Sequence, residues 1–133
     1  MHNKRKENFV KVYDIFRNYE QYFHLPFTLD KADTSWFGFL LTLKDGAPFA
    51  KNDLVDFLEA NKIQTRSYFT GNALFHPAYS DLAMFEQYTD PAAQFPVATK
   101  TTNDTFFLGV YPGITDEQLD YIKQTVDKFF QNI

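Results

Sequence analysis

The spacing of apolar residues predicts a helix near each end of the chain. From Lys6 to Phe23, large apolar side chains recur every three or four residues, which places them on one face of a helix. A capping-box pattern begins at Thr115, and a second apolar stripe of the same spacing follows it to Phe130. Each helix therefore has an apolar face that a core must cover.

Short apolar runs between these helices predict strands. Ser35–Leu43 and Thr105–Val110 are rich in aromatic and branched residues, and Ile63–Tyr68 alternates polar with apolar positions. The first run is apolar at nearly every position, so we expect a central strand that is largely covered on both faces. Its aromatic residues are expected in the core, and they are Trp36, Phe37 and Phe39.

Shorter segments complete the pattern. Asn52–Ala60 reads as a short amphipathic helix, and Val97–Asn103 as another that begins after Pro96. Residues 26–34 are predicted as a polar loop, and residues 73–91 as a loop with a helical turn. The order of elements predicts one domain, residues 1–133, with an α/β (α+β) sandwich in which helices cover a small mixed or antiparallel sheet.

Composition narrows the function classes. With 44% hydrophobic and 19% aromatic residues, the chain is too apolar to remain disordered. A net charge of −4 disfavours a nucleic acid partner. The longest apolar run, Trp36–Leu41, is too short to cross a membrane, and no apolar stretch follows the charged first residues. We therefore expect a cytoplasmic protein.

The sequence offers few groups for chemistry. It has no cysteine, which excludes disulfides, thiolate nucleophiles and cysteine metal ligands in this chain. Its histidines are too far apart for a readable ligand set, and no glycine-rich phosphate loop is present. We therefore predict no catalytic residue and no metal site.

Arg66, Asn72 and Tyr79 are the candidate substrate-binding residues. Arg66 ends a predicted strand just before a polar turn, and arginine suits carboxylate or phosphate groups, although a surface ion pair is the alternative. Asn72 follows Gly71 in that turn, where it either shapes the turn or contacts a ligand. We expect Arg66 and Asn72 to be exposed at one cleft edge, with Tyr79 close behind.

Several runs of sequence resemble a known family. They are Ser35–Phe49 leading into Asn52–Val55, Ile63–Arg66 with Phe69–Leu74 and Pro77–Tyr79, and Asn103–Glu117. In this order they resemble the C-terminal domain of the DegT/DnrJ/EryC1/StrS sugar aminotransferase family. Within the family they most resemble the CDP-4-keto-6-deoxyglucose-3-dehydratases of dideoxysugar and lipopolysaccharide O-antigen biosynthesis.

The resemblance implies a part of a larger enzyme. Family members are dimers of the fold-type-I aminotransferase kind, in which a large domain holds pyridoxal phosphate (PLP) or pyridoxamine phosphate (PMP) and a small domain covers the site. In the dehydratase branch the large domain also supplies a catalytic histidine and the cysteines of a [2Fe–2S] cluster. This chain resembles only the small domain. The resemblance thus implies no cofactor in this chain, no activity alone, and as partners a large domain or a separate chain supplying it, a second copy, and a nucleotide-sugar.

One motif departs from the family pattern. Where the dehydratases show Asn-Leu-Leu-Arg-Gln-Pro, this chain reads Asn-Ala-Leu-Phe-His-Pro from Asn72 to Pro77, so that Phe75 replaces the arginine. A different sugar or a drifted sequence would each account for the change. Two functions follow as hypotheses: a small domain that contributes substrate contacts and dimer surface, or a stand-alone, non-catalytic interaction module with the same fold.

Overall fold

The structure is a computed structural model that describes residues 2–80, 82, 84 and 86–133. The elements are, in chain order, α1 (His2–Arg17), β1 (Phe23–His24), β2 (Gly38–Leu43), α2 (Lys51–Ala60), β3 (Thr65–Ser67), the 3-10 turn η1 (Ala73–Phe75), α3 (Pro77–Ser80), α4 (Pro91–Gln94), α5 (Pro96–Asp104), β4 (Thr105–Gly109) and α6 (Asp116–Phe130). No helix among these described segments is long and apolar enough to cross a membrane.

The strands form one antiparallel sheet of four strands in the order β1-β2-β4-β3. The long strands β2 and β4 lie at the centre, and Phe39 pairs with Leu108 in their register. The predicted small sheet with helices is therefore confirmed, and of the two predicted alternatives, mixed or antiparallel, it is antiparallel. The central position of the first predicted strand is confirmed as well. The short outer strand β1, in which Phe23 pairs with Leu43, was not predicted.

The N-terminal helix ends earlier than its apolar spacing predicted. Helix α1 stops at Arg17, and the chain then makes turns in which the Tyr19 N–H donates to the Phe16 carbonyl at 2.9 Å. Tyr19 and Phe23 still reach the apolar interior, but from these turns and from β1. The prediction of a helix to Phe23 was wrong because apolar residues in turns kept the helical spacing.

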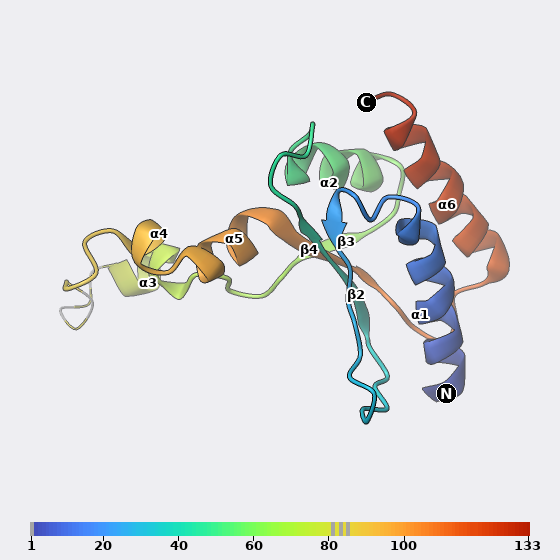
Figure 1. Ribbon diagram of the computed structural model, residues 1–133, viewed down its shortest axis with the longest axis horizontal. Helices are drawn as coiled ribbons and strands as arrows, with labels where there is room; N and C mark the ends of the chain where they lie inside the picture. Colours follow the sequence, from blue (N-terminus) through green and yellow to red (C-terminus); the bar gives the residue numbers. More distant parts are fainter. Residues whose placement is uncertain (1, 81, 83, 85) are drawn as a thin grey trace.

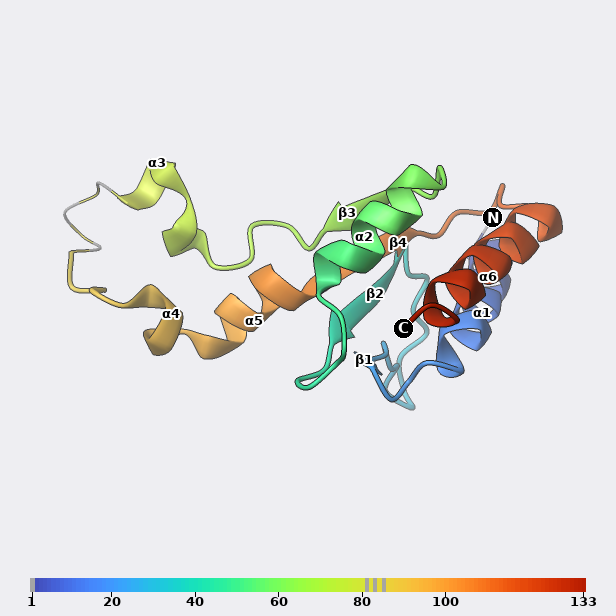
Figure 2. The ribbon, with the colours of Figure 1, turned by 90° about the horizontal axis from the view of Figure 1, so that it is seen from above.

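The hydrophobic core lies on one face of the sheet. Alternation along the strands turns Phe39 and Leu41 of β2 and Phe106 of β4 toward the helices, and all three are buried. Helices α1, α2 and α6 add Phe16, Leu58 and other buried side chains to the same cluster. Figures 1 and 2 both show α1 and α6 lying side by side, away from α5.

Among the described residues, no helix lies over the centre of the opposite face of the sheet (Figures 1 and 2). We call this surface the bare face; it comprises Gly38, Leu40, Arg66, Phe107 and Gly109. Leu40 and Phe107 are half-buried there, so the second face of the predicted central strand is covered only in part. Pairing in a sheet specifies which side chains share a face, but not whether a second layer covers them.

The aromatic run before β2 also differs from expectation. Phe39 is fully buried, but Phe37 is 59% exposed and Trp36 is 37% exposed. The ring of Phe37 packs edge-on against Phe107 of the bare face, with centroids 5.7 Å apart. Phe37 is therefore not a core residue, because the face that it joins is open.

The described residues between 69 and 104 form an arm that projects from the sheet. Figures 1 and 2 show α3, α4 and α5 extending away from the sheet on the side opposite to α1 and α6. Within the segment predicted as a loop with a helical turn, the described residues form η1 and α3, and positions 81, 83 and 85 lie outside the description. The arm returns to the sheet through α5, which leads directly into β4 and so confirms the helix predicted over Val97–Asn103.

Candidate functional site

Arg66 lies on the bare face. It pairs with Phe107 in the register of β3 and β4, and its side chain is exposed, as expected. Its positive charge contributes to lowering the pKa of Glu59, although the larger causes are the backbone and hydroxyl hydrogen bonds that Thr65 donates to that carboxylate. The guanidinium forms no ion pair with any residue that the structure describes. Arg66 is thus an available cation on an open surface.

Asn72 is buried, with 3% of its surface exposed, so the expectation of an exposed side chain was wrong. It caps η1 by accepting a hydrogen bond from the Leu74 N–H at 3.1 Å. Its amide group donates to the Pro91 carbonyl at 3.2 Å and to the Thr99 hydroxyl at 3.3 Å. Asn72 therefore connects the segment that leads from β3 into the arm with α4 and α5, through which the chain returns to the sheet.

A second set of contacts fixes the same place, which we call the arm root (Gly71, Asn72, Thr99 and Thr102). The Thr102 hydroxyl accepts a hydrogen bond from the Asn72 N–H at 2.6 Å and donates to the Ala98 carbonyl at 2.9 Å. Gly71 has a φ of +60°, and a side chain there would collide with Thr102. The sequence offered no signal for Thr99 or Thr102, since their partner is about thirty residues away in the chain.

Lys51 of α2 connects the arm root to the rest of the domain. Its ammonium group donates to the Thr102 carbonyl at 2.9 Å. Burial lowers the pKa of Lys51, while the nearby charge of Asp104 acts in the opposite direction. The arm is therefore anchored to the body by a partly desolvated lysine as well as through β3 and β4.

The arm contains a small cavity of about 300 Å³. Its wall is mostly apolar and aromatic, and the lining residues are Gly71, Asn72, Ala73, Leu74, Tyr79, Tyr88, Phe95 and Ala98. The rings of Tyr88 and Phe95 pack edge-to-face at 5.2 Å. Two of the predicted site residues, Asn72 and Tyr79, thus meet at one cavity, whereas Arg66 lies apart on the sheet.

The residue that stands in place of the motif's arginine faces outward. Phe75 is 43% exposed, and it does not belong to the lining of the arm cavity. The neighbouring His76 has a ring nitrogen 3.0 Å from the Thr70 carbonyl, which holds that turn closed. An aromatic side chain therefore stands on the arm surface at the position where the related motif has a cation.

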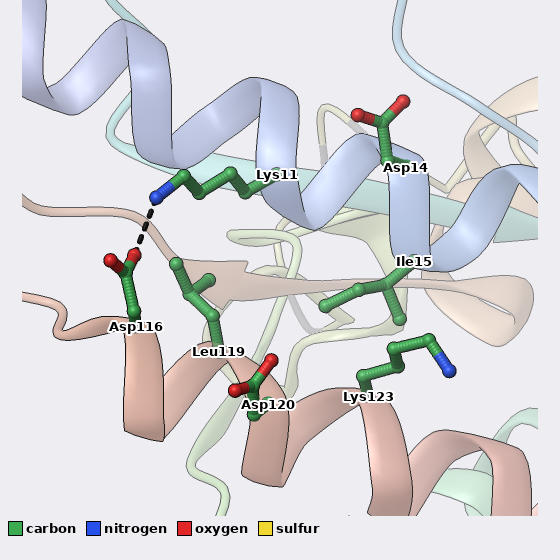
Figure 3. A pocket seen from close by; sticks show the side chains of 7 residues that line it. All are labelled: Lys11, Asp14, Ile15, Asp116, Leu119, Asp120 and Lys123. Atoms are coloured by element: carbon green, nitrogen blue, oxygen red, sulfur yellow. Dashed lines mark hydrogen bonds and ion pairs between the residues drawn. The ribbon is translucent and has the colours of Figure 1, made fainter.

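A separate groove of about 360 Å³ runs between α1 and α6 (Figure 3). Ile15 and Leu119 point toward each other across it, and Lys11 pairs with Asp116 at its end. The hydrogen bond from Lys11 lowers the pKa of Asp116. Exposed pairs of this kind contribute little, so the groove is the charged edge of a helix seam rather than a ligand site.

The arm cavity does not form a complete cofactor site. The lining of the arm cavity contains no lysine for a Schiff base and no cationic group for a phosphate. Lys51, whose pKa is lowered by burial, donates to the Thr102 carbonyl instead. No cluster of metal-binding side chains occurs among the residues that the structure describes, and a chain without cysteine supplies no thiolate to an iron–sulfur cluster.

The fold and the site together define a class of domain. It is an α+β unit with helices on one face of a four-stranded antiparallel sheet, an open second face and a projecting arm. Solved enzymes contain the same fold. An aminotransferase from Psychrobacter cryohalolentis matches 99% of this chain and 35% of its own, with a TM-score of 0.80 and 17% identity. The E. coli GDP-4-keto-6-deoxy-D-mannose-3-dehydratase, solved with bound hydrated PLP, matches 92% of this chain and 30% of its own, with a TM-score of 0.66 and 21% identity.

The sequence comparison identifies the family. Residues 1–127 match the model of the DegT/DnrJ/EryC1/StrS aminotransferase family, and the chain belongs to that family. The lipopolysaccharide biosynthesis protein RfbH of Salmonella typhimurium is 34% identical over 127 residues, covering 96% of this chain and 28% of the relative. The dTDP-4-dehydro-2,6-dideoxy-D-glucose 3-dehydratase of Saccharopolyspora spinosa is 40% identical over 111 residues, covering 79% of this chain and 22% of the relative. The chain therefore spans about a quarter of the length of these relatives.

Proposed function

We propose that this chain serves as the small, substrate-contacting domain of a PLP- or PMP-dependent nucleotide-sugar 3-dehydratase or aminotransferase of dideoxysugar and lipopolysaccharide biosynthesis. One observation carries the proposal: the family match runs along residues 1–127, yet the chain covers only 28% of RfbH and 22% of the dTDP-sugar dehydratase. The relatives thus hold most of their residues outside the matched segment. We place the cofactor chemistry there, and we expect this chain to be inactive alone.

Arg66 is the proposed anion contact. It is exposed and forms no ion pair with a described residue, so its guanidinium is free to donate charge-assisted hydrogen bonds to the phosphates of a nucleotide-sugar. Tyr79, at the rim of the arm cavity, is the proposed contact for the sugar. Asn72 belongs to the same proposed site as a positioning residue, because its buried amide is committed to the arm root.

The proposal assigns the chain binding and orientation rather than bond chemistry. A cofactor held by the larger part of the enzyme would supply the electron sink, and the residues of this chain would hold the substrate against it. Since nucleotide-sugars are made from intracellular nucleotides, a cytoplasmic location belongs to the same proposal. The complete enzyme would work as a dimer, as the resemblance implies.

A chimeric enzyme tests the proposal. The segment of RfbH that matches this chain is replaced by residues 1–127, and turnover of CDP-, GDP- and dTDP-linked 4-ketosugars is followed with added PMP. We expect dehydration or amino transfer with at least one of them, and none with the isolated chain. A folded chimera that binds PMP but turns over none of these sugars would contradict the proposal and favour the non-catalytic interaction module.

Arg66→Ala in the active chimera tests the anion contact. Loss of charge-assisted hydrogen bonds should lower kcat/KM roughly 10- to 100-fold with an unchanged melting temperature. Arg17→Ala is the matched control, because Arg17 is an exposed arginine that pairs with Asp14 on α1, away from the bare face. Full activity of the Arg66 variant with a lowered melting temperature would leave only a structural role for Arg66.

A further inference from the structure

The turn that leads from β2 into α2 contains Asp45 and Gly46. The Ala47 N–H donates to the Lys44 carbonyl at 3.4 Å, so Asp45 and Gly46 are the two central residues of a β-turn. Gly46 has a φ of +81°, which glycine adopts without steric cost at the third position of a turn. Both residues are exposed, and 94% of the Asp45 side chain is accessible to solvent. Asp45 is also the only aspartate or asparagine in the sequence that a glycine follows directly.

The backbone nitrogen of Gly46 is open to reaction. Its N–H forms no hydrogen bond with any residue that the structure describes. A Cβ at this position would meet no atom within 4 Å, so neighbouring groups do not crowd the turn. Glycine itself has no side chain that would shield the nitrogen. A bond from this nitrogen to Cγ of Asp45 would close a five-membered ring.

Lys100 of α5 restrains the carboxylate of Asp45. Its Nζ lies 2.6 Å from Oδ1 of Asp45 and 2.9 Å from Oδ2 of Asp104, so that one ammonium group holds both carboxylates. The hydrogen bond from Lys100 lowers the pKa of Asp45, and the charges of Lys100 and His24 act in the same direction, whereas desolvation acts against them. A carboxylate cyclises poorly, because the hydroxyl group that must leave as water is present only in the protonated acid. The ion pair therefore slows ring closure.

We propose that the turn at Asp45 and Gly46 is a site of spontaneous covalent modification, at which aspartate converts to isoaspartate, and that Lys100 controls the rate. In the first step, the Gly46 nitrogen forms a bond to Cγ of Asp45, and the amide proton and the carboxyl hydroxyl leave as water. In the second step, water opens the cyclic imide: attack at Cγ restores aspartate, and attack at the main-chain carbonyl carbon gives isoaspartate. One water is released and one is consumed, so the reaction needs no oxidant or co-reactant. This inference is independent of the proposed function.

The modification would alter a contact between the body of the domain and the arm. In isoaspartate the main chain runs through Cβ and the free carboxylate is bonded directly to Cα, so Lys100 would lose the geometry of its present ion pair with position 45. Lys100 belongs to α5, through which the arm returns to β4. The hydrogen bond from Lys51 to the Thr102 carbonyl would remain, and an exposed ion pair contributes little, so we expect the arm to stay attached.

Incubation of the isolated chain at physiological pH and temperature tests the site. Isoaspartate is measured by peptide mapping and by methyl transfer from S-adenosylmethionine with an isoaspartyl methyltransferase. Asp30 is the internal control, because it too is the second residue of an exposed turn, but Lys31 follows it. In that turn the Ala32 N–H donates to the Leu29 carbonyl at 2.8 Å. We expect isoaspartate to form roughly tenfold faster at Asp45 than at Asp30, because glycine leaves the attacking nitrogen unshielded. Equal rates at the two positions, or no isoaspartate at Asp45, would overturn the proposal.

Two variants test the roles of the neighbouring residues. Lys100→Met should speed isoaspartate formation at Asp45 at least about twofold, because the carboxyl group loses its cationic partner. Lys123→Met is the matched control, since it removes an ion pair with Asp127 on α6 and should leave the rate unchanged. Gly46→Ala should slow the reaction roughly tenfold, because a methyl group then shields the nitrogen, and circular dichroism checks that this variant is folded.

The outcomes for the two variants are separate. An unchanged rate in Lys100→Met would overturn the control of the reaction by Lys100. An unchanged rate in folded Gly46→Ala would overturn the assignment of the Gly46 nitrogen as the attacking group.

Discussion

Asn72→Ala would separate a structural role of this asparagine from a ligand contact. The substitution removes the amide that donates to the Pro91 carbonyl and the Thr99 hydroxyl, and it removes the oxygen that accepts from the Leu74 N–H. The donated bonds are long, at 3.2 and 3.3 Å, which places them at the weaker end of the usual range. The lost hydrogen bonds and the partners left unsatisfied should together lower the stability of the arm by roughly 2–3 kcal/mol.

This loss of stability should be confined to the arm. Asn72 is the one fully buried side chain among the described residues of the arm, so little apolar burial holds the arm against opening. The core on the other side of the sheet does not depend on it. We therefore expect the arm to open while the domain stays folded.

Amide hydrogen exchange measures this opening. Peptides from residues 71–104 should exchange roughly 30- to 100-fold faster in Asn72→Ala, since each 1.4 kcal/mol corresponds to about a factor of ten. Peptides from β2 should keep their protection. Asn103→Ala, at an exposed asparagine of the same arm, is the matched control and should leave exchange unchanged. Unchanged exchange in Asn72→Ala, together with a fall in the kcat/KM of the chimera, would refute the structural role and restore Asn72 as a direct ligand contact.

Three further predictions concern the body of the domain. Phe39→Ala should cost roughly 3–5 kcal/mol in urea unfolding, because Phe39 is fully buried and rings of α1 lie 5.2 to 5.9 Å away; a cost below about 1 kcal/mol would place it outside the core. Burial, followed by the hydrogen bond to Asp127, raises the pKa of Tyr19 from 10.0 to about 12. Because the folded state favours the protonated phenol, this stabilisation is complete below pH 10 and is lost as the pH rises toward 12; alkaline unfolding of Tyr19→Phe should lack that component. Thr115→Ala removes the cap of α6 and should cost about 1 kcal/mol in thermal unfolding, whereas Asp in its place should retain most of the stability.

Local sequence patterns were sufficient to predict those elements whose formation depends mainly on their own residues. The capping box at Thr115 and the apolar stripe after it predicted α6, because a helix end and a helix face are both encoded within a few turns. Strands β2 and β4 were predicted for a similar reason, since aromatic and branched residues favour extended backbone. The family, too, could be recognised from the sequence, and the match over residues 1–127 confirms it.

Tertiary contacts decided the features that bear on the site. Asn72 is buried by partners that lie 19 to 30 residues further along the chain, and no local pattern around a turn reports such partners. The register that sets Arg66 beside Phe107 likewise depends on pairing between distant strands.

The sequence by itself determined most of the helices and strands, among them β2, β4 and α6, and to which family the chain belongs. Only the tertiary structure decided where α1 ends, which side chains the arm root buries and that one face of the sheet is open. Apolar spacing is the same for a residue that faces a core and for one that the fold leaves exposed, as Phe39 and Phe37 illustrate. Phe39 and Phe37 differ in burial because helices of this chain cover one face of the sheet and leave the other face exposed.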